Sequence, residues 1–582
     1  MKIASERRTE PRFTDYKGRP TASLPLDVEV LLAQDWEKAE DWESKLEALS
    51  LRDPQYFVAG QLHSELSNWE KLLATVNNEQ SKLVEKWLRY GVNVEDYFRP
   101  FKGTFKGISL DSDLPPPYVF KNYDNCGNLR DEVIIHLTEG LRSGAIELVG
   151  RVGEVPPPHL VMPLLMVQGL RKSRLVHDCR FLNLFMKPVK FSLEGLSVIP
   201  GLLEAGDYIA SSDEKSAYQG VSLAQSSRKY FGVEFEGFYF QWTVLPFGWS
   251  VSPFVYQTIG MQVTSLLRLK GVITTQYLDD RFLGPLVRAI RPKIERTGLS
   301  IYYNAAVLSC TGFTIAFDKS EWFPLLRMLH LGLIMHSDTR FFEIPEAKKL
   351  SFKSVRESIL DSNLVHTKLL QKLMGKCVSF SLCIPVAKMY IRAMARSISW
   401  AEKKGCLIPV VGDLKEEILF WRFLDNHDNW VKWRGERHTE ISLATDASGF
   451  GWGASLSEDR VIRDFWDSND ARPIHLKEAD ALLKTMRSIS GEVSDRRVDV
   501  WVDNQALLKA WNNKGGKDPA LIEILKSLVT LLSDIHSDLR LLYIESAKNP
   551  ADAPSRKISA TDSKLAVSSW EKSTGLVWPS FL

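Results

Sequence analysis

The feature that most restricts the fold of this chain is a pair of aspartates set between two short β-type runs. Asp279 and Asp280 follow residues 272–275, which read Val-Ile-Thr-Thr, and precede Phe282 and Leu283. β-branched and aromatic residues favour strands, so the pattern predicts a hairpin whose tip projects both carboxylates from a rigid element. An isolated Asp-Asp pair is more often only a polar turn, and the surrounding sequence has to decide between the two.

A third carboxylate extends this site. Asp213 follows the β-type run 208–212 and precedes a turn. Carboxylates gathered in one place repel each other unless a cation lies between them. Mg²⁺ prefers oxygen ligands and is commonly bound by carboxylates together with substrate phosphates, and two such ions can hold the attacking and leaving oxygens of an in-line phosphoryl transfer. Asp213, Asp279 and Asp280 therefore predict a two-metal phosphoryl-transfer site.

The sequence around these aspartates carries an ordered series of motifs. They are RKSRLVHDCRFLN at 171–183, DEKSAYQ at 213–219, LPFGWSVSP at 245–253, YLDD at 277–280, GFTIAFDKS at 312–320 and LHLG at 329–332. In this order the motifs resemble those of retroelement reverse transcriptases, closely over residues 160–345 and loosely to residue 400. The resemblance implies a right-hand polymerase with fingers, palm and thumb, in which Asp213, Asp279 and Asp280 are the metal-binding carboxylates of the palm.

The resemblance also implies contacts to the incoming nucleotide. Arg174 matches the fingers arginine that grips the triphosphate, since a guanidinium suits the geometry of phosphate, and Lys172 or Arg171 is expected to assist. Tyr218 matches the aromatic residue under the nucleotide sugar, which would clash with a 2′-hydroxyl and so favours deoxynucleotides. The remaining matches are Phe247 and Gly248 beside the nucleotide and template, Lys319 near the departing pyrophosphate, the turn 329–332 at the primer end, and Asp178, Arg180 and Asn183 as a structural brace of the fingers that includes a buried Asp–Arg pair.

A second set of acids follows in the C-terminal part of the chain. Asp446 ends the strand-like run 441–446, Glu478 lies on a helix with one apolar face, Asp503 ends the run 498–503, and Asp552 belongs to the motif NPADAPSR. The separations between these acids are 32, 25 and 49 residues, so only the fold can bring them together. Each acid alone has a simpler interpretation; Asp503, for example, suits a helix N-cap.

Together the acids resemble those of a ribonuclease H domain over residues 438–557. The resemblance implies that Asp446, Glu478, Asp503 and Asp552 bind two Mg²⁺ ions, which activate a water and stabilise the leaving 3′-oxygen. The substrate would be the RNA strand of an RNA–DNA hybrid, recognised by its A-form-like shape and its 2′-hydroxyls. The sequence shows no extra basic helix between the second and third helices of that domain, so the polymerase part is expected to hold the hybrid.

Charge is distributed unevenly along the chain. The totals of 74 basic and 72 acidic residues nearly cancel, which taken alone argues against a nucleic-acid-binding protein. Residues 1–100, however, have 14 Lys or Arg against 18 Asp or Glu, net −4, whereas residues 351–410 have 10 against 3, net +7. The basic stretch lies where a thumb would bind a duplex backbone; the alternative is a solvated basic face. Its candidate contacts are Lys368, Lys372, Lys376, Lys388, Arg392 and Arg396.

The predicted fold class is α+β and multidomain, with a right-hand polymerase followed by an α/β ribonuclease H-like domain. The predicted parts are an N-terminal helical region of unknown role at 1–110, fingers and palm at 111–350, thumb and a short connection at 351–436, ribonuclease H at 437–560 and a C-terminal tail at 561–582. The N-terminal region has no motif that distinguishes a brace for the fingers from a binding site for a partner protein.

Composition bounds the setting in which the chain works. The sequence has no run of 18 apolar residues and no apolar core at its N-terminus, so neither a membrane span nor a secretory signal is predicted. Six cysteines without a CxxC pair suggest neither a zinc site nor a disulfide framework. These features predict a reduced intracellular protein that is cytoplasmic, particle-associated or nuclear.

The resulting hypothesis is a reverse transcriptase that copies RNA and DNA templates into DNA, coupled to a ribonuclease H that degrades RNA in hybrids during retroelement replication. It requires Mg²⁺ at both sites, with Mn²⁺ as a substitute. Its partners are an RNA template, a DNA primer, the RNA–DNA hybrid and dNTPs, besides element-encoded capsid, recombinase or integrase proteins.

Both the element class and the activity leave alternatives. The motif wording is most similar to DIRS-like elements, which use a tyrosine recombinase, and otherwise to LTR retroelements. Two alternatives to a doubly active enzyme stay open: a non-catalytic RNA-binding scaffold that retains both folds, and an active polymerase with a silent ribonuclease H domain.

Overall fold

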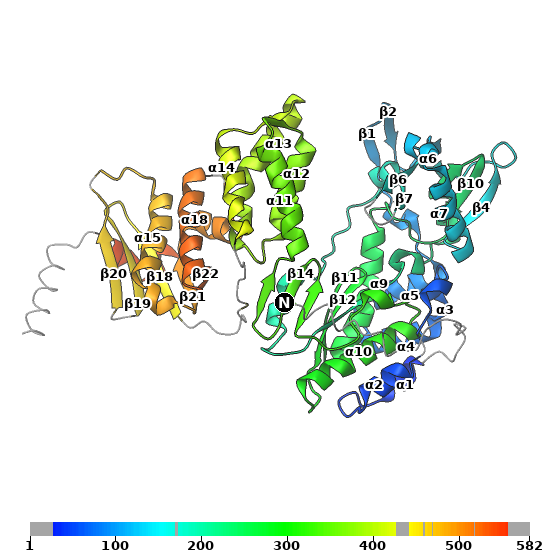
Figure 1. The fold of residues 1–582 in the computed structure, drawn as a ribbon, viewed down its shortest axis with the longest axis horizontal. Helices are drawn as coiled ribbons and strands as arrows, with labels where there is room; N and C mark the ends of the chain where they lie inside the picture. The colour runs from blue at the N-terminus through cyan, green and yellow to red at the C-terminus, as the bar shows by residue number, and fades with distance from the viewer. Residues whose placement is uncertain are drawn as a thin grey trace, which may run out of the picture. The chain divides into compact units, whose positions relative to one another are not determined.

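The computed structural model describes residues 27–49, 51–168, 173–426, 433, 441–457, 460–467, 469–516 and 518–556. The chain forms two compact units, Met1–Leu331 and Gly332–Leu582 (Figure 1). Both combine helices with sheets, so the predicted α+β, multidomain fold class is confirmed. None of the described helices is both long enough and apolar enough to cross a membrane.

A three-stranded antiparallel sheet lies at the centre of the first unit. Its strands are β8 (Ala210–Asp213), β11 (Val272–Tyr277) and β12 (Asp280–Leu286), in the order β11-β12-β8. Helices α9 (Ser252–Leu269) and α10 (Lys293–Cys310) pack against it. Helix α10 is buried at every residue from Thr297 to Cys310, and a helix buried all round needs cover on each side.

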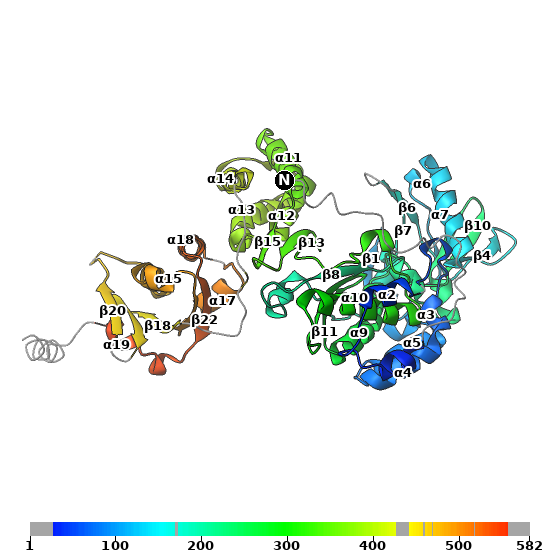
Figure 2. The same ribbon diagram turned by 60° about the horizontal axis from the view of Figure 1, so that its bottom comes forward.

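The N-terminal helices supply that cover. They are α1 (Val28–Ala33), α2 (Trp42–Glu47), α3 (Gln61–Ser64), α4 (Leu66–Val76) and α5 (Ser81–Tyr90). Of these, α1 and α2 pack against α10, and α4 and α5 pack against α9 (Figures 1 and 2). Trp36 stacks on Tyr303 of α10 with 3.9 Å between ring centroids. The ring of Trp42 fills the space beside Gly298, where a Cβ would lie 2.2 Å from it. This N-terminal layer, residues 27–98, therefore completes the core around α10.

A second sheet and two hairpins complete the first unit. The sheet order is β3-β5-β9-β10-β4, and helices α6 and α7 lie near its β4 edge and the hairpin β6-β7. The elements are β1 (Phe101–Phe105), β2 (Ile108–Ser112), β3 (Tyr118–Val119), α6 (Asp124–Asn128), α7 (Arg130–Ser143), β4 (Ile146–Arg151), β5 (Leu160–Val161), β6 (Leu164–Gln168), β7 (Ser173–His177), α8 (Arg180–Leu184), β9 (Gly232–Phe235), β10 (Phe238–Trp242) and β13 (Arg327–His330).

The second unit begins with helices and ends with an α/β domain. Its first elements are β14 (Leu333–His336), β15 (Phe341–Glu343), α11 (Glu346–Leu360), β16 (Leu364–Val365), α12 (Thr367–Ser379), α13 (Arg392–Lys404), β17 (Ile408–Pro409) and α14 (Gly412–Phe420). Buried Arg356 ties α11 to the segment after α14, because its guanidinium donates to the Trp421 carbonyl at 2.8 Å and to Asp425 at 2.6 Å.

The α/β domain has a five-stranded sheet in the order β20-β19-β18-β21-β22. The first three strands pair antiparallel, whereas β21 pairs parallel with both β18 and β22. The elements are β18 (Ile441–Ala447), β19 (Gly451–Ser457), β20 (Arg460–Phe465), α15 (Ile474–Ser488), α16 (Ser490–Val493), β21 (Arg497–Val502), α17 (Gln505–Asn512), α18 (Pro519–Asp534), β22 (Asp538–Tyr543) and α19 (Asp552–Ser555). The α/β fold predicted for this part of the chain is therefore present.

Candidate active sites

The three-stranded sheet β11-β12-β8 places the first three predicted carboxylates at one end. Asp280 at the start of β12 is the register partner of Asp213 at the end of β8. Asp279 lies in the preceding tight turn, where Leu278 has a φ of +55°. The Asp279 carbonyl accepts the Glu214 N–H at 2.9 Å, which joins this turn to the end of β8. The hairpin predicted from the sequence is therefore present, and its tip faces Asp213.

Burial and mutual repulsion act on these acids. Burial first, and then the charges of Asp279 and Asp213, raise the pKa of Asp280 to about 6. Burial also raises the pKa of Asp213, against the opposing effect of Lys319, whose Nζ lies 3.0 Å from Asp213 Oδ1. Hard oxygen donors that resist carrying negative charge together suit a divalent cation. These carboxylates are the kind of donor that Mg²⁺ prefers, but among the described residues their oxygens do not form a set within 4.8 Å of one another.

An ion pair lies on the opposite side of the same strands. Glu214 and Arg281 each follow a predicted metal-binding aspartate by one residue, so the two-residue period of a strand turns them away from that site. Arg281 Nη2 lies 3.1 Å from Glu214 Oε1, and both side chains are almost fully buried. The Tyr256 hydroxyl donates to the other Glu214 oxygen. Arg281 also donates to Thr264 Oγ1 at 2.5 Å, so both charges have partners on α9.

Two glutamines hold the aspartate turn. Gln257 on α9 accepts the Leu278 N–H at 2.9 Å and donates to the Gln276 carbonyl at 3.1 Å. The Gln276 side chain donates to the Leu278 carbonyl at 2.9 Å. A Cβ at Gly260 would lie 1.9 Å from Gln276 Nε2, so this close approach needs glycine. These residues were not singled out from the sequence, because their role depends on α9 lying against the hairpin.

The predicted nucleotide contacts lie in several places. Buried Tyr218 and half-exposed Phe247 face each other with 4.9 Å between ring centroids. Burial and the charge of Asp279 raise the Tyr218 pKa to about 12, which puts Tyr218 close to the carboxylates. Gly248 has a φ of +111°, and a Cβ there would lie 2.2 Å from the His177 carbonyl oxygen. Arg174 is exposed on β7, whereas Lys172 lies outside the described residues.

The predicted structural brace is present with one difference. Arg180 Nη2 lies 2.7 Å from Asp178 Oδ2, and the Tyr123 hydroxyl donates to the same oxygen. Only Asp178 is buried, since the Arg180 side chain is 64% exposed, so the prediction of a buried pair was wrong for Arg180. Asn183 donates to the Gly248 carbonyl at 2.9 Å and accepts the Ser250 N–H at 2.9 Å. It therefore supports the loop beside the nucleotide contacts.

The predicted thumb contacts differ in exposure. Lys368, Lys372, Lys388 and Arg396 are exposed, whereas Lys376 and Arg392 are partly buried. Burial and the nearby charge of Lys372 lower the pKa of Lys376, so these two lysines are neighbours on α12.

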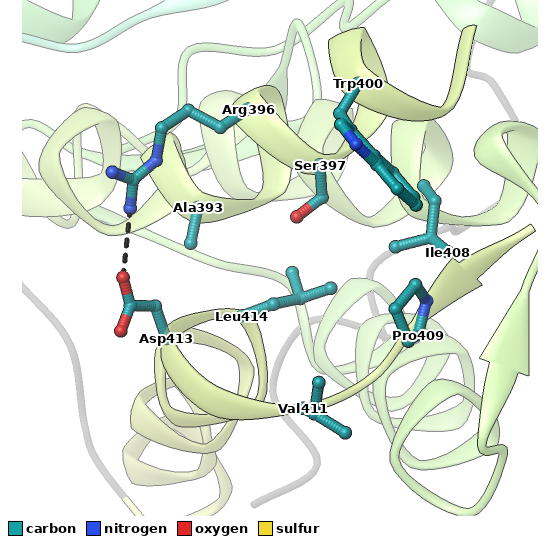
Figure 3. A pocket seen from close by; sticks show the side chains of 9 residues that line it. All are labelled: Ala393, Arg396, Ser397, Trp400, Ile408, Pro409, Val411, Asp413 and Leu414. Atoms are coloured by element: carbon teal, nitrogen blue, oxygen red, sulfur yellow. Dashed lines mark hydrogen bonds and ion pairs between the residues drawn. The ribbon is translucent and has the colours of Figure 1, made fainter. Parts of the chain in front are cut away.

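Arg396 lies at one end of an apolar groove between α13, β17 and α14. Its guanidinium pairs with Asp413 at 3.3 Å (Figure 3). The groove has a volume of about 400 Å³ and includes Trp400, Pro409 and Leu414. The charge of Arg396 is therefore partly balanced within the chain.

In the α/β domain, one acid comes from each of three elements. Asp446 lies on β18, Glu478 on α15 and Asp503 directly after β21. Ligand oxygens of these three all lie within 4.8 Å of one another, the only such set among the described residues. Burial, together with the charges of Asp503 and Asp446, raises the pKa of Glu478 to about 7. This donor set also fits a divalent cation.

The fourth acid and two supporting residues lie around this set. Asp552 begins α19, contributes to the raised pKa of Asp446 and pairs with Arg556 at 2.7 Å. The Ser555 hydroxyl donates to Asp446 Oδ2 at 2.7 Å, and the Asn504 amide donates to Glu478. Ser555 and Asn504 were not predicted, although each lies within three residues of a predicted acid.

Comparison with known proteins adds independent evidence. The family model described as reverse transcriptase (RNA-dependent DNA polymerase) matches residues 168–290. The Gag-Pol polyprotein of bovine immunodeficiency virus (strain R29) is 32% identical over 148 residues, which are 22% of this chain and 10% of that protein. The putative enzymatic polyprotein of Cassava vein mosaic virus is 27% identical over 238 residues, 40% of this chain and 34% of that protein. This chain thus spans between a tenth and a third of the length of these relatives.

Among solved structures, the foamy viral protease-reverse transcriptase dRH in complex with double-stranded DNA has a TM-score of 0.48 at 14% identity, covering 86% of this chain and 85% of that one. The family match, residues 168–290, includes Asp213, Asp279 and Asp280. The chain therefore contains a reverse transcriptase domain similar to those of viral Gag-Pol polyproteins.

Proposed function

We propose that the chain is an RNA- and DNA-templated DNA polymerase that extends a primer at the site formed by Asp213, Asp279 and Asp280. The observation that carries this proposal is the register pairing of Asp213 with Asp280, with Asp279 in the adjoining turn, inside the segment that matches reverse transcriptases. Mg²⁺ bound by these carboxylates would activate the primer 3′-hydroxyl and offset charge on the transferred phosphoryl group.

The chain's own residues would position the nucleotide. Tyr218 and Phe247 offer an aromatic surface beside the carboxylates. Lys319, whose ammonium lies 3.0 Å from Asp213, would provide a positive charge for the departing pyrophosphate. Arg174 and Lys172 would bind the triphosphate, and the basic side chains from Lys368 to Arg396 would bind the duplex backbone.

Primer extension tests the polymerase proposal. The unsubstituted chain should incorporate dNTPs on RNA and on DNA templates in the presence of Mg²⁺, with Mn²⁺ as a substitute. The double substitution Asp279→Asn and Asp280→Asn keeps the size of both side chains and removes their charges, so it should abolish extension. Extension that survives this substitution would rule out the assignment.

We also propose a ribonuclease H activity at Asp446, Glu478, Asp503 and Asp552. The specific observation in its favour is the close set of three acid oxygens, with Ser555 and Asn504 each donating to one acid. These donors would keep the acids oriented when a divalent cation binds. Mg²⁺ there would supply an activated water for cleavage of the RNA strand.

A hybrid labelled on its RNA strand, incubated with and without Mg²⁺, separates three outcomes. Mg²⁺-dependent cleavage that is lost in Asp446→Asn but kept in the Asp279→Asn, Asp280→Asn variant supports two independent sites. Extension without cleavage identifies a silent ribonuclease H domain. Binding of the hybrid with neither reaction identifies a non-catalytic scaffold.

The finer assignment concerns the type of element. The motif sequences are most similar to those of DIRS-like retroelements. On that assignment, the element's recombinase and capsid would be partners of the chain. The chain would then act on the element's RNA and its cDNA inside the cell.

A further inference from the structure

The residues around Tyr218 form a segment that is held from two sides. This Tyr218 segment, residues 217–224, pairs on one side with the stretch leading to Phe247: the Leu223 N–H donates to the Thr243 carbonyl at 2.8 Å, and the Leu245 N–H donates to the Val221 carbonyl at 3.0 Å. Its other side faces the N-terminal layer. The position of Tyr218 therefore depends on both neighbours.

The N-terminal layer contacts this segment through its backbone. The Gly60 N–H donates to the Gln219 carbonyl at 2.7 Å. Val92 accepts the Ala224 N–H at 3.0 Å and donates to the Ser222 carbonyl at 2.9 Å. The chain approaches so closely that a Cβ at Gly91 would lie 2.5 Å from the Ala224 nitrogen.

His63, on α3, hydrogen-bonds through its side chain to the backbone of the Tyr218 segment. Its Nε2 accepts the Ser222 N–H at 2.7 Å, across 159 residues of sequence. Burial lowers the pKa of His63 to about 4, so at neutral pH the ring is uncharged and can accept this bond. The backbone of Leu88, in the last turn of α5, acts on the ring in the opposite sense and raises its pKa.

Tyr218 itself has little freedom once its segment is fixed. Its ring is buried between Phe247, at 4.9 Å, and Tyr256, at 5.7 Å between centroids. Tyr256 in turn donates to the buried carboxylate of Glu214. A shift of the segment backbone would therefore move the Tyr218 ring relative to the carboxylates instead of being absorbed by a rotation.

We propose that the N-terminal layer, through His63, positions Tyr218 and so sets the preference of the polymerase for deoxynucleotides over ribonucleotides. His63 is a positioning residue, because it acts through the backbone of Ser222 and touches no substrate. This proposal rests on the proposed polymerase function. It gives residues 27–98 a role in substrate selection in addition to their cover of α10.

The test compares kcat/KM for a dNTP and for the matching rNTP on one primer–template. His63→Leu removes the acceptor, and we expect the dNTP/rNTP ratio to fall by roughly tenfold or more, since a displacement near 1 Å at a reacting centre changes rates by up to about a hundredfold. The Kd for primer–template should stay the same. His63→Gln keeps an acceptor near the position of Nε2 and should restore the ratio to within about threefold.

Asn68→Leu is the matched control. Asn68 is buried in the same layer and donates to the Cys310 carbonyl at 2.8 Å, but this bond goes to the end of α10 and not to the Tyr218 segment. Its loss should lower stability and leave the dNTP/rNTP ratio unchanged. A fall of the ratio in Asn68→Leu equal to that in His63→Leu would overturn the proposal, because it would mean that any damage to the layer has this effect.

A second variant keeps the His63 side chain and displaces the segment through the backbone, at a position whose φ of +79° also strains any residue other than glycine. Gly91→Ala presses a Cβ onto the backbone of Leu223 and Ala224, so the ratio should fall here too; if His63→Leu does not fold, this variant decides. Incorporation by the unsubstituted chain with an unchanged ratio in these variants would overturn this inference alone. If the unsubstituted chain incorporates no nucleotide, the proposed polymerase function fails and the inference fails with it.

Discussion

The buried ion pair of Glu214 and Arg281 offers a quantitative test of what stabilises the sheet β11-β12-β8. Both side chains are almost fully buried, so removing one leaves the other charge without its partner. Breaking a buried pair in this way costs about 3–5 kcal/mol. Arg281→Met should lie at the low end, about 3 kcal/mol, because Glu214 can take up a proton and keeps the Tyr256 hydroxyl. Glu214→Leu should cost about 4 kcal/mol, because an arginine cannot lose its proton.

The double variant should be more stable than either single variant. Glu214→Leu with Arg281→Met replaces both charges by apolar groups, which is often neutral. The hydroxyls of Tyr256 and Thr264 then lose a partner, and this should cost about 2 kcal/mol in all. Additive single costs would give about 7 kcal/mol, so the expected coupling is about 5 kcal/mol.

Hydrogen exchange read by mass spectrometry suits this cycle, because a multidomain chain does not unfold in one step. Peptides covering β8 and β12 report the opening free energy of the strands that carry Asp213 and Asp280. Lys102→Met is a matched control: Lys102 forms an ion pair with Asp111 in the same unit, but both are largely exposed, and exchange of β8 and β12 should not change. A cost below about 1 kcal/mol for Arg281→Met, or a coupling below about 1 kcal/mol, would refute the reasoning.

Three further predictions concern metal binding, the ribonuclease site and the N-terminal layer. The pKa is raised to about 6 for Asp280 and to about 7 for Glu478. Without metal, protonation of these acids therefore contributes its whole stability below about pH 4, and this contribution is lost as the pH rises through 6 and 7. Mg²⁺ should therefore raise the melting temperature at pH 8 and hardly at pH 5; equal shifts at both pH values would contradict this. Ser555→Ala removes the hydroxyl that donates to Asp446 and should slow hybrid cleavage about tenfold with primer extension unchanged, whereas Ser488→Ala, on the exposed end of α15, should change neither reaction. Trp36→Ala empties the stack on Tyr303 and should lower the opening free energy of α10, read by hydrogen exchange, by about 3 kcal/mol. Tyr56→Ala, at an exposed position of the same layer, should leave it unchanged; equal effects would show that the layer does not cover α10.

The hairpin at Asp279 and Asp280 could be predicted because its signal is local. Strand-forming residues flank the pair, and the pairing of Asp280 with Asp213 agrees with the predicted gathering of acids. The Glu214–Arg281 pair also had a signal, since a charge one residue after a site-facing aspartate has to face the core of a covered sheet. The register that joins the two charges could not be predicted from the sequence, because they lie 67 residues apart.

Contacts made by helices were harder to predict than contacts within strands. Gln257 looks like any polar residue on α9, and its bonds to Leu278 and Gln276 exist only because α9 packs against the hairpin. The same holds for His63, whose partner Ser222 lies far along the chain. An apolar helical period shows which face of a helix is buried, and not which helix that face will cover.

Segment charge was informative only in part. The excess of basic residues over 351–410 correctly marks a positively charged helical region, yet a sum does not show which cations already have a partner. Arg396 pairs with Asp413, which lies three residues beyond that segment, and Lys376 donates to Ser351. The net charge therefore overstates how many of these cations are available to a polyanion. Lys368 and Lys372 are exposed and are the better candidates.

The two candidate sites hold several carboxylates close together in different ways. In the sheet β11-β12-β8, neighbouring strands bring Asp213 and Asp280 together, and Lys319 offsets part of their charge. The core-facing pair of Glu214 and Arg281 is neutral as a whole. In the α/β domain, acids from separate elements converge, and neutral donors from Ser555 and Asn504 orient them without cancelling their charge. Burial, and then the charges of the neighbouring carboxylates, keep the pKa of Asp280 and of Glu478 raised in the folded chain. A fold that gathers acids in partly buried positions would be stabilised by a cation from solution, so the proposal of metal-dependent sites predicts that Mg²⁺ raises the stability of both.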